Sequence, residues 1–380
     1  MSHAYIIDGV RTPFGRRQGG LSTVRPDDLA AHTLKGLVQR QDLDPREVED
    51  VRLGCVTQVG EQGYNIGRLA PMIAGFPVEV PGVTVNRMCA SSLETVNQAA
   101  QAIMADVHDI VIAAGVESMS RVPMGSDGST FSDDLLRQYN IIPQGLSAEL
   151  IAEKWNLTRE ALDTFSYNSH QRALASQKAG YFAGEIMPVE VNQSDGSKST
   201  IDHDEGPRAD TTLEKMSTLR TVFKPDGVVT AANSSQITDG SAALLLASEA
   251  AVLRHHWTPR ARIVAMSVVG VDPIIMLTGP IPATAKVLTK AGLRFSDMDV
   301  IEINEAFASV VLAWGAEYHP DWERVNPHGG AIALGHPLGA SGGRLVLTAL
   351  RHLEETRGRY GLITMCIGWG MAVATIIERL

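Results

Sequence analysis

The sequence predicts an α/β protein with a mainly parallel sheet. Strand-like and helix-like segments alternate along the first half of its 380 residues, which is typical of this class. The continuous apolar run at His108–Ala114 is typical of a strand buried on both faces. A chain of this length has room for two or three domains.

Hydrophobic spacing and helix start signals predict the elements of the fold in order along the chain. Strands are expected at Ala4–Val10, Val51–Thr57, Val83–Asn86, His108–Ala114, Val300–Asn304, Tyr360–Met365 and Ala372–Glu378. Helices are expected at Pro26–Arg40, Ser91–Met104, Arg159–Ala179 and Ala306–Tyr318, and from a glycine-rich turn at Gly329–Gly343 through Leu353. The first helix has apolar residues at helical spacing after a Pro-Asp-Asp start.

The segment from about Ser120 to Val229 is different in character. It is rich in polar and turn residues, as at Gln193–Ser199, and predicts an insertion that lies outside the sheet and covers a ligand. A distant repeat is also suggested. Cys-Ala-Ser-Ser (89–92) and Gly-Ala-Ser-Gly (339–342) each open a helix that precedes a strand, although two unrelated strand–helix units remain an alternative.

Composition excludes several classes of protein. A net charge of −10 argues against nucleic-acid binding, because that requires a basic face. No apolar run reaches the length of a membrane span, and the start of the chain does not have the pattern of a signal peptide. Three cysteines form no disulfide framework and suggest a reducing compartment. We therefore expect a cytoplasmic protein without a metal site.

Cys89 is the first candidate for chemistry. It lies between a short strand and the helix that begins at Ser91, so free backbone N–H groups and the helix dipole would lower its pKa and bind an oxyanion. The small residues Ala90, Ser91 and Ser92 leave room for a substrate. The alternative is a small buried hydrophobic residue.

His336 lies in the glycine-rich segment Gly329–Gly343, which we expect to be an irregular loop that approaches a ligand closely. A histidine there suits acid–base work, because its ordinary pKa is near neutral. A purely structural histidine is the alternative.

Two more candidates follow strands. Cys366 comes at the carboxyl end of a strand, beside Gly368-Trp-Gly370, where open α/β sheets place their sites. This fragment is only a weak match to a dinucleotide loop. Asn304 closes the strand Val300-Ile-Glu-Ile and could hold a water or a carbonyl, or could cap the next helix.

Taken together, these segments resemble the thiolase family. The matching stretches are Asn86-Arg-Met-Cys-Ala-Ser-Ser, Asn304-Glu-Ala-Phe, Gly329-Gly-Ala-Ile-Ala-Leu-Gly-His-Pro-Leu-Gly and Cys366-Ile-Gly-Trp-Gly. Further similarity runs from Val10-Arg-Thr-Pro-Phe-Gly to Ala374-Thr-Ile-Ile-Glu-Arg and covers essentially the whole chain. The Gly-His-Pro loop with a downstream Cys-x-Gly is the most specific part.

The resemblance implies duplicated α/β halves, each with a mixed five-stranded sheet, and an inserted loop domain. We expect the first half at 1–258, with the insertion at about 119–232, and the second half at 259–380. The resemblance also implies that the protein is a homodimer, a homotetramer or a subunit of a β-oxidation complex.

The resemblance further implies roles for the candidates. Cys89 would be the nucleophile that becomes acylated, His336 its base, and Cys366 the acid–base for the acetyl carbanion. Asn304 would hold a water that forms one oxyanion hole with His336, and the N–H groups of Cys89 and Gly368 would form the other. No tightly bound cofactor is implied, since coenzyme A is a substrate. Its expected contacts are Arg208, Phe223, Ala231, Ser235 and Phe307.

Some positions depart from the family pattern. Trp369 stands where glycine is common, Leu277 stands where glycine is usual, and Pro143-Gln144 replaces a pair that often includes methionine. These departures leave the acyl chain undetermined. The expected activity is thiolytic cleavage of 3-ketoacyl-CoA, as in fatty-acid β-oxidation. The alternatives are a biosynthetic acetyl-CoA acetyltransferase and a non-catalytic lipid-binding protein.

Overall fold

The computed structural model describes residues 2–192 and 196–380, so the start of the expected turn at Gln193 lies outside the described residues. The strands are β1 (Tyr5–Arg11), β2 (Gly15–Arg16), β3 (Asp50–Gly54), β4 (Gly82–Val85), β5 (Ile110–Ser118), β6 (Val189–Asn192), β7 (Lys198–Ile201), β8 (Thr238–Ala247), β9 (Ala261–Gly270), β10 (Val300–Ile303), β11 (Tyr360–Ile367) and β12 (Met371–Arg379).

The longer helices are α1 (Pro26–Arg40), α2 (Ile66–Ile73), α3 (Ser91–Met104), α5 (Gln144–Lys154), α6 (Arg159–Lys178), α9 (Pro280–Ala291), α10 (Ala308–Tyr318) and α12 (Ser341–Thr356). The shorter ones are α4 (Asp133–Gln138), α7 (Leu213–Ser217), α8 (Glu249–Arg254) and α11 (Ala331–Leu334). Helices α1 and α3 have the expected bounds. The glycine-rich segment is not wholly irregular, because α11 lies within it and α12 begins inside it.

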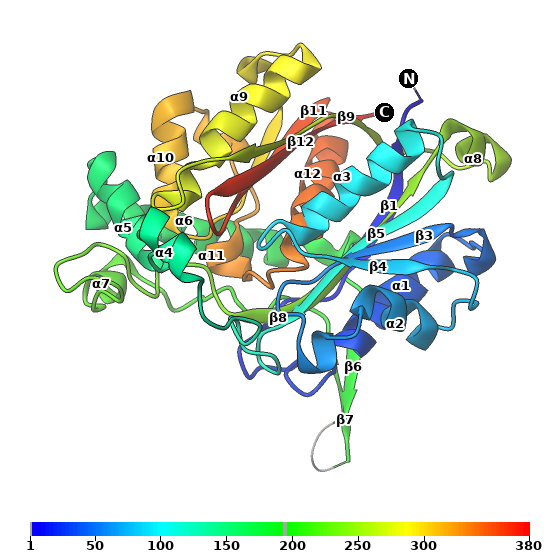
Figure 1. Ribbon diagram of the computed structural model, residues 1–380, viewed down its shortest axis with the longest axis horizontal. Coiled ribbons are helices and arrows are strands. Elements are labelled where there is room, and N and C mark those ends of the chain that lie inside the picture. The colour runs from blue at the N-terminus through cyan, green and yellow to red at the C-terminus, as the bar shows by residue number, and fades with distance from the viewer. Residues whose placement is uncertain (1, 193–195) are drawn as a thin grey trace.

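The main sheet is mixed rather than mainly parallel, so that prediction was wrong (Figure 1). Its strands follow the order β10-β11-β12-β9-β1-β8-β5-β3-β4, with β2 paired to β8. The pairs β3–β4, β3–β5 and β10–β11 are parallel. The long strands β8 and β9 were not expected, and both run antiparallel to their neighbours.

The two ends of this sheet repeat one pattern. In the first, β5 is parallel to β3 and antiparallel to β8; in the second, β11 is parallel to β10 and antiparallel to β12. The strands β1, β8, β5, β3 and β4 form a set of five, as expected. The second set has four among the described residues, and the fifth position is reduced to a single parallel bridge between Ile301 and Val325.

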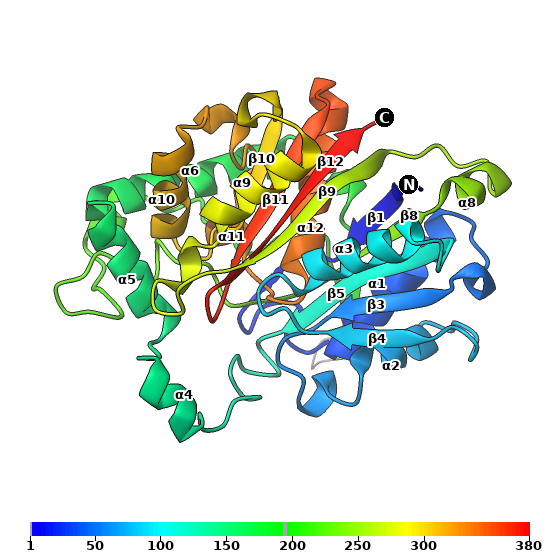
Figure 2. The same cartoon turned by 45° about the horizontal axis from the view of Figure 1, so that its top comes forward.

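Helices α3 and α12 pack against each other between the two parts of the sheet (Figures 1 and 2). They are the two helices of the suggested repeat, and each leads into a strand. The N–H of Gly343 donates to Oγ of Ser92 at 2.9 Å. A Cβ on Gly342 would lie 2.3 Å from the backbone nitrogen of Leu93. Small residues at both helix starts therefore allow a close approach, which brings the two starts to one place.

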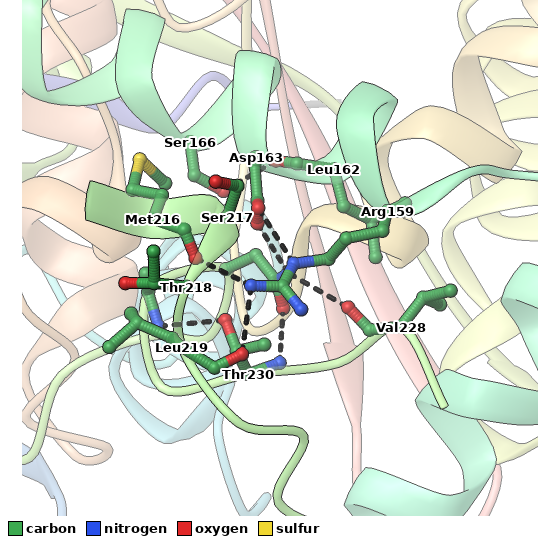
Figure 3. Close-up of polar contacts among 12 residues, drawn as sticks. Arg159, Leu162, Asp163, Ser166, Met216, Ser217, Thr218, Leu219, Val228 and Thr230 are labelled. Carbon is green, nitrogen blue, oxygen red and sulfur yellow. Dashed lines mark hydrogen bonds and ion pairs between the residues drawn. The ribbon is translucent and has the colours of Figure 1, made fainter. Parts of the chain in front are cut away.

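The chain between β5 and β8 forms α4 to α7 and the β6–β7 hairpin, apart from the main sheet (Figure 1). A partly buried polar network joins α6 to the segment around α7 (Figure 3). Arg159 donates to the carboxylate of Asp163 at 2.6 Å and to the carbonyl oxygens of Met216 and Leu219 at 2.5 and 3.1 Å. These bonds fix one wall of a cavity described below.

Candidate active site

Cys89 lies in the tight turn between β4 and α3, two residues before the helix begins. The preceding residue, Met88, has φ of 47°, a left-handed conformation that is strained for a long side chain and is often found at functional sites. Only 5% of the Cys89 surface is exposed. The turn therefore presents a sulfur atom to an interior space rather than to bulk solvent.

The sequence predicted a lowered pKa for Cys89, and this prediction was wrong. Burial raises the pKa of this thiol to about 11, because a buried thiolate loses its hydration. The N–H groups of Gly368 and of Cys89 itself act in the opposite direction, as does the side chain of Gln144. The helix start thus supplies hydrogen-bond donors, but they do not outweigh desolvation. Cys89 is a neutral thiol that requires a base.

His336 is oriented to be that kind of base. Oγ of Ser341 donates to the carbonyl of Pro337 at 2.9 Å and lies 2.6 Å from Nδ1 of His336. A serine hydroxyl that donates to Pro337 accepts a hydrogen bond from Nδ1–H of His336, and we assign this tautomer to the ring. Nε2 is then an acceptor, which agrees with its 3.2 Å contact to the amide nitrogen of Asn304. Ser341 was not expected from the sequence as a positioning residue.

The electrostatic surroundings keep this imidazole neutral. Burial, and after it the positive charge of Arg344, lowers the pKa of His336 to about 3. Arg344 lies on α12 and forms a buried ion pair with Glu302 of β10 at 3.1 Å. At neutral pH, His336 therefore offers an unprotonated Nε2.

Cys366 lies within β11 rather than after it, and it is fully buried. Burial raises the pKa of its thiol, and the negative charge of a Cys89 thiolate raises it further. The two sulfurs are thus close enough to interact. Asn304 lies beside the same strand, because its backbone N–H donates to the carbonyl oxygen of Thr364, two residues before Cys366, at 3.0 Å.

Asn304 is not a helix cap. The helix that follows, α10, begins at Ala308 and has Phe307 at its N-cap. The side-chain Oδ1 of Asn304 is buried and has no hydrogen-bond partner among the described residues. An unpartnered buried oxygen is costly, so this atom is available to accept a hydrogen bond from a water or a ligand.

Gly368 lies in the turn between β11 and β12. A Cβ at this position would lie 2.7 Å from Nε2 of Gln144, so glycine lets the Gln144 amide and the Gly368 N–H reach the same sulfur. Gln144, at the start of α5, was expected only to influence the substrate. No local pattern indicated its contact with Cys89, because it belongs to the inserted segment.

A buried carboxylate, missed in the sequence, holds the loops of the site together. Glu117 at the end of β5 accepts hydrogen bonds from the N–H groups of Val56, Thr57 and Gly339 at 2.9 to 3.1 Å and from Gln62 at 2.7 Å. It thereby joins the end of β3 to the loop that contains His336. A lone glutamate at the end of an apolar strand was the available signal.

The expected coenzyme A contacts fall into two adjoining groups. Arg208, Ala231 and Ser235 line a cavity of about 900 Å³ with Arg16 and Arg17, two cations that the sequence analysis did not include. A neighbouring cavity of about 260 Å³ is lined by Arg208 and Ala231 together with Met216 and Leu219, which the network of Arg159 fixes.

The other two expected contacts are a pair of rings. Phe223 and Phe307 pack edge to face with ring centres 6.0 Å apart. The strand bridge between Ser234 and Phe307, and the bond from the N–H of Ser235 to the carbonyl of Ala306 at 2.9 Å, join this pair to the cavities. A polar entrance and an apolar passage therefore adjoin.

Comparisons with known proteins agree with this geometry. The model of the thiolase N-terminal domain matches residues 4–250, and the model of the thiolase C-terminal domain matches residues 257–379. The chain belongs to the thiolase family. No helix among the described parts of this thiolase is long and apolar enough to cross a membrane.

Relatives of this thiolase have several substrates. A β-ketoadipyl-CoA thiolase of Acinetobacter baylyi is 48% identical over the whole of both chains. A steroid 3-ketoacyl-CoA thiolase of Mycobacterium tuberculosis is 49% identical and covers all of this chain and 95% of its own. Among solved structures, the acetyl-CoA acetyltransferase of Bacillus anthracis has a TM-score of 0.94 at 37% identity, covering 100% of this chain and 99% of its own.

Proposed function

We propose that this thiolase cleaves 3-ketoacyl-CoA with coenzyme A, through a thioester on Cys89, to give acetyl-CoA and a shortened acyl-CoA. The observation that most supports this is the placement of His336, whose ring is held by Ser341 at Nδ1 and by the Asn304 amide at Nε2 in the same buried site as both cysteines. A lipid-binding protein without catalysis would have no need of an oriented base.

In the first half-reaction, Nε2 of His336 takes the proton of the Cys89 thiol, and the sulfur attacks the 3-keto carbon. The bond between C2 and C3 then breaks. Its electron pair leaves on the acetyl-CoA fragment, which the Cys366 thiol protonates at carbon. The acyl group remains on Cys89 as a thioester.

In the second half-reaction, the Cys366 thiolate left by the first takes the proton of the coenzyme A thiol, and the coenzyme A sulfur attacks the thioester. Cys89 leaves and recovers its proton from His336. Negative charge develops on an oxygen in both half-reactions. The N–H groups of Cys89 and Gly368 already donate to the Cys89 sulfur, and a water held by Asn304 would supply a second set of donors together with the Nε2 proton that His336 has taken from Cys89. Donors oriented in advance in this way stabilise such charges.

Coenzyme A would enter through the cavities that Arg208, Ala231 and Ser235 line, with Phe223 and Phe307 along the pantetheine. Arg208 would supply local positive charge to a phosphate in a chain that is acidic overall. The division at 258/259 with an insertion at about 119–232, the homo-oligomeric state and the cytoplasmic location stay predictions.

Biosynthetic condensation of two acetyl-CoA molecules is a second candidate. It is the same path in reverse, and the structural similarity to an acetyl-CoA acetyltransferase favours it. A thiolysis assay that follows 3-ketoacyl-CoA consumption, run beside a condensation assay with acetyl-CoA alone, separates the two. The proposed function predicts far greater kcat/KM for cleavage of longer 3-ketoacyl-CoA. Activity confined to acetyl-CoA and acetoacetyl-CoA would contradict it.

A further inference from the structure

An apolar groove of about 460 Å³ opens beside the reactive cysteines. Its lining residues come from three parts of the chain and are Phe131, Leu135, Tyr139, Ile141, Val271, Pro273 and Trp369. Cavities of a few hundred Å³ with apolar walls are typical of small-molecule sites. The rings of Phe131 and Trp369 pack edge to face with centres 5.2 Å apart, yet 44% and 43% of these side chains are exposed.

Trp369 has a backbone conformation that is energetically unfavourable for a residue with a large side chain. Its φ is 67°, in the left-handed region that glycine adopts freely and a bulky residue does not. Strain of this kind persists where the surrounding structure uses the side chain. In this turn the indole forms one wall of the groove.

A first wall connects the groove to the thiols. Gly368, whose N–H bonds to the Cys89 sulfur, directly precedes Trp369. The N–H of Trp369 donates to the sulfur of Met276 at 3.4 Å. Met276 belongs to the same hydrophobic cluster as Cys366 and Phe307. The cluster that contains Cys366 therefore reaches the backbone of Trp369 through Met276.

A second wall makes the same connection from the inserted segment. Ile141 lines the groove, Ile142 packs on the cluster that contains Cys366, and Gln144 bonds to the Cys89 sulfur. Two separate segments thus run from the reactive sulfurs to the groove. An acyl chain attached to Cys89 has this groove as a place for its far end.

The charges around the groove are negative. Among the residues that the structure describes, no lysine, arginine or histidine lines it. Asp272 lies between two lining residues, and Asp133 and Asp134 directly precede Leu135 in α4. The cation on this short helix, Arg137, is paired with Asp134. A second carboxylate at the end of an acyl chain would find an apolar wall here, with like charge nearby and no cationic partner in the lining.

We infer that the acyl group of the substrate is a neutral, apolar chain or ring system that occupies the Trp369 groove, and that acyl chains ending in a carboxylate are rejected. This inference rests on the proposed function, since it names the substrate class for the same site. It separates this chain from the activity named for its β-ketoadipyl-CoA relatives, although they are 48% identical.

The test is thiolysis of a matched pair, 3-oxodecanoyl-CoA and 3-oxodecanedioyl-CoA, which differ only in a terminal methyl or carboxylate. Acetoacetyl-CoA is included because its acyl chain is too short to reach the groove. We expect kcat/KM to be roughly 100-fold higher for the methyl-ended substrate, a discrimination that a pocket achieves by leaving one polar group unpaired. Equal or higher kcat/KM for the dicarboxylate would overturn the inference. Failure to cleave any of the three would instead refute the proposed function.

A charge introduced into the groove tests its location. Leu135→Arg places a cation on a lining residue and should reduce the preference for the methyl-ended substrate by about tenfold. Leu136→Arg is the matched control, because Leu136 is the next residue of α4, is exposed and does not line the groove. The control should keep the full preference. An equal change in both variants, or in neither, would show that the acyl end lies elsewhere.

Discussion

The two buried cysteines of the site are held in different ways. Cys89 lies in a strained turn at a helix start and receives hydrogen bonds from the N–H groups of Gly368 and Cys89 and from Gln144. Cys366 lies inside a strand, and only its own N–H opposes the effect of burial on its pKa. Both pKa values are raised, but that of Cys366 is raised further. Burial is the largest cause at both thiols, and the additional hydrogen-bond donors at Cys89 and the charge of Cys89 acting on Cys366 are what differ between them.

This difference matches two kinds of chemistry. A sulfur surrounded by donors is suited to bear negative charge and to hold an acyl group beside an oxyanion site. A thiol that strongly resists ionisation is suited to give its proton to a carbanion and to take it back. The predictions below each alter one side of this comparison.

The largest effect is expected from removing the shared base. His336→Ala should slow acylation of Cys89 and complete thiolysis by about 10³-fold, because the neutral thiol then has no acceptor for its proton. Stopped-flow acylation and steady-state thiolysis measure the two rates. His328→Asn is the control: burial also lowers the pKa of His328 to about 3, but this residue contacts Ser176 and His352. Equal losses in both variants would refute the assignment of the base.

A smaller and selective effect is expected at the second cysteine. Cys366→Ala should still take an acetyl group from acetyl-CoA, yet lose thiolysis by about 10²-fold, the usual scale for one general acid–base. Single-turnover acylation beside the full reaction separates these outcomes. Cys55→Ala, at a buried cysteine that is raised in pKa but lies outside the reactive set, should leave both rates intact. Near-normal cleavage by Cys366→Ala would make this cysteine structural.

The raised pKa of Cys89 predicts a pH dependence in the free enzyme. A thiol with a pKa of about 11 is protonated at neutral pH, so its thiolate fraction grows about tenfold with each pH unit below that value. Alkylation of Cys89 by iodoacetamide, followed by mass spectrometry, should therefore keep rising from pH 7 to about 9.5. A cysteine-containing peptide, whose pKa is about 8.5, would level off in this range. Levelling of Cys89 near pH 8 would show that the donors outweigh burial.

The smallest effect is expected from a substitution at Arg208, which lines the two cavities assigned to coenzyme A. Arg208→Ala should raise KM for coenzyme A by about tenfold and change kcat much less, as loss of uniform binding does. Arg220→Ala, at an exposed arginine that lines neither cavity, should change neither constant. A collapse of kcat in Arg208→Ala with KM unchanged would contradict a role in binding.

Local patterns predicted local structure well. The bounds of α1 and α3 were correct because apolar spacing and helix-start residues lie in the sequence itself. The prediction of a mainly parallel sheet was wrong, because β8 and β9 pair with strands that are distant in the sequence. An apolar run does not indicate whether its partner strand is parallel or antiparallel. Composition predicted that the segment after Ser120 lies outside the sheet, but it did not predict the contacts of that segment with the site.

The same limit applies to the site. The motifs identified Cys89, His336, Cys366 and Asn304, and the structure brings them together. The sign of the Cys89 pKa shift was wrong, because the helix start is visible in the sequence whereas burial by Gln144, Leu338 and the β11–β12 turn is not. Ser341, Gln144 and Glu117 act through geometry between distant segments, so spacing alone could not reveal them.

The central claim is that the acyl group is carried on Cys89. Incubation with acetyl-CoA or a 3-ketoacyl-CoA, rapid acid quench and peptide mapping by mass spectrometry test it directly. The account predicts an acyl adduct on Cys89 that disappears when coenzyme A is added. An adduct found only on Cys55 or Cys366, or no adduct under turnover conditions, would contradict it.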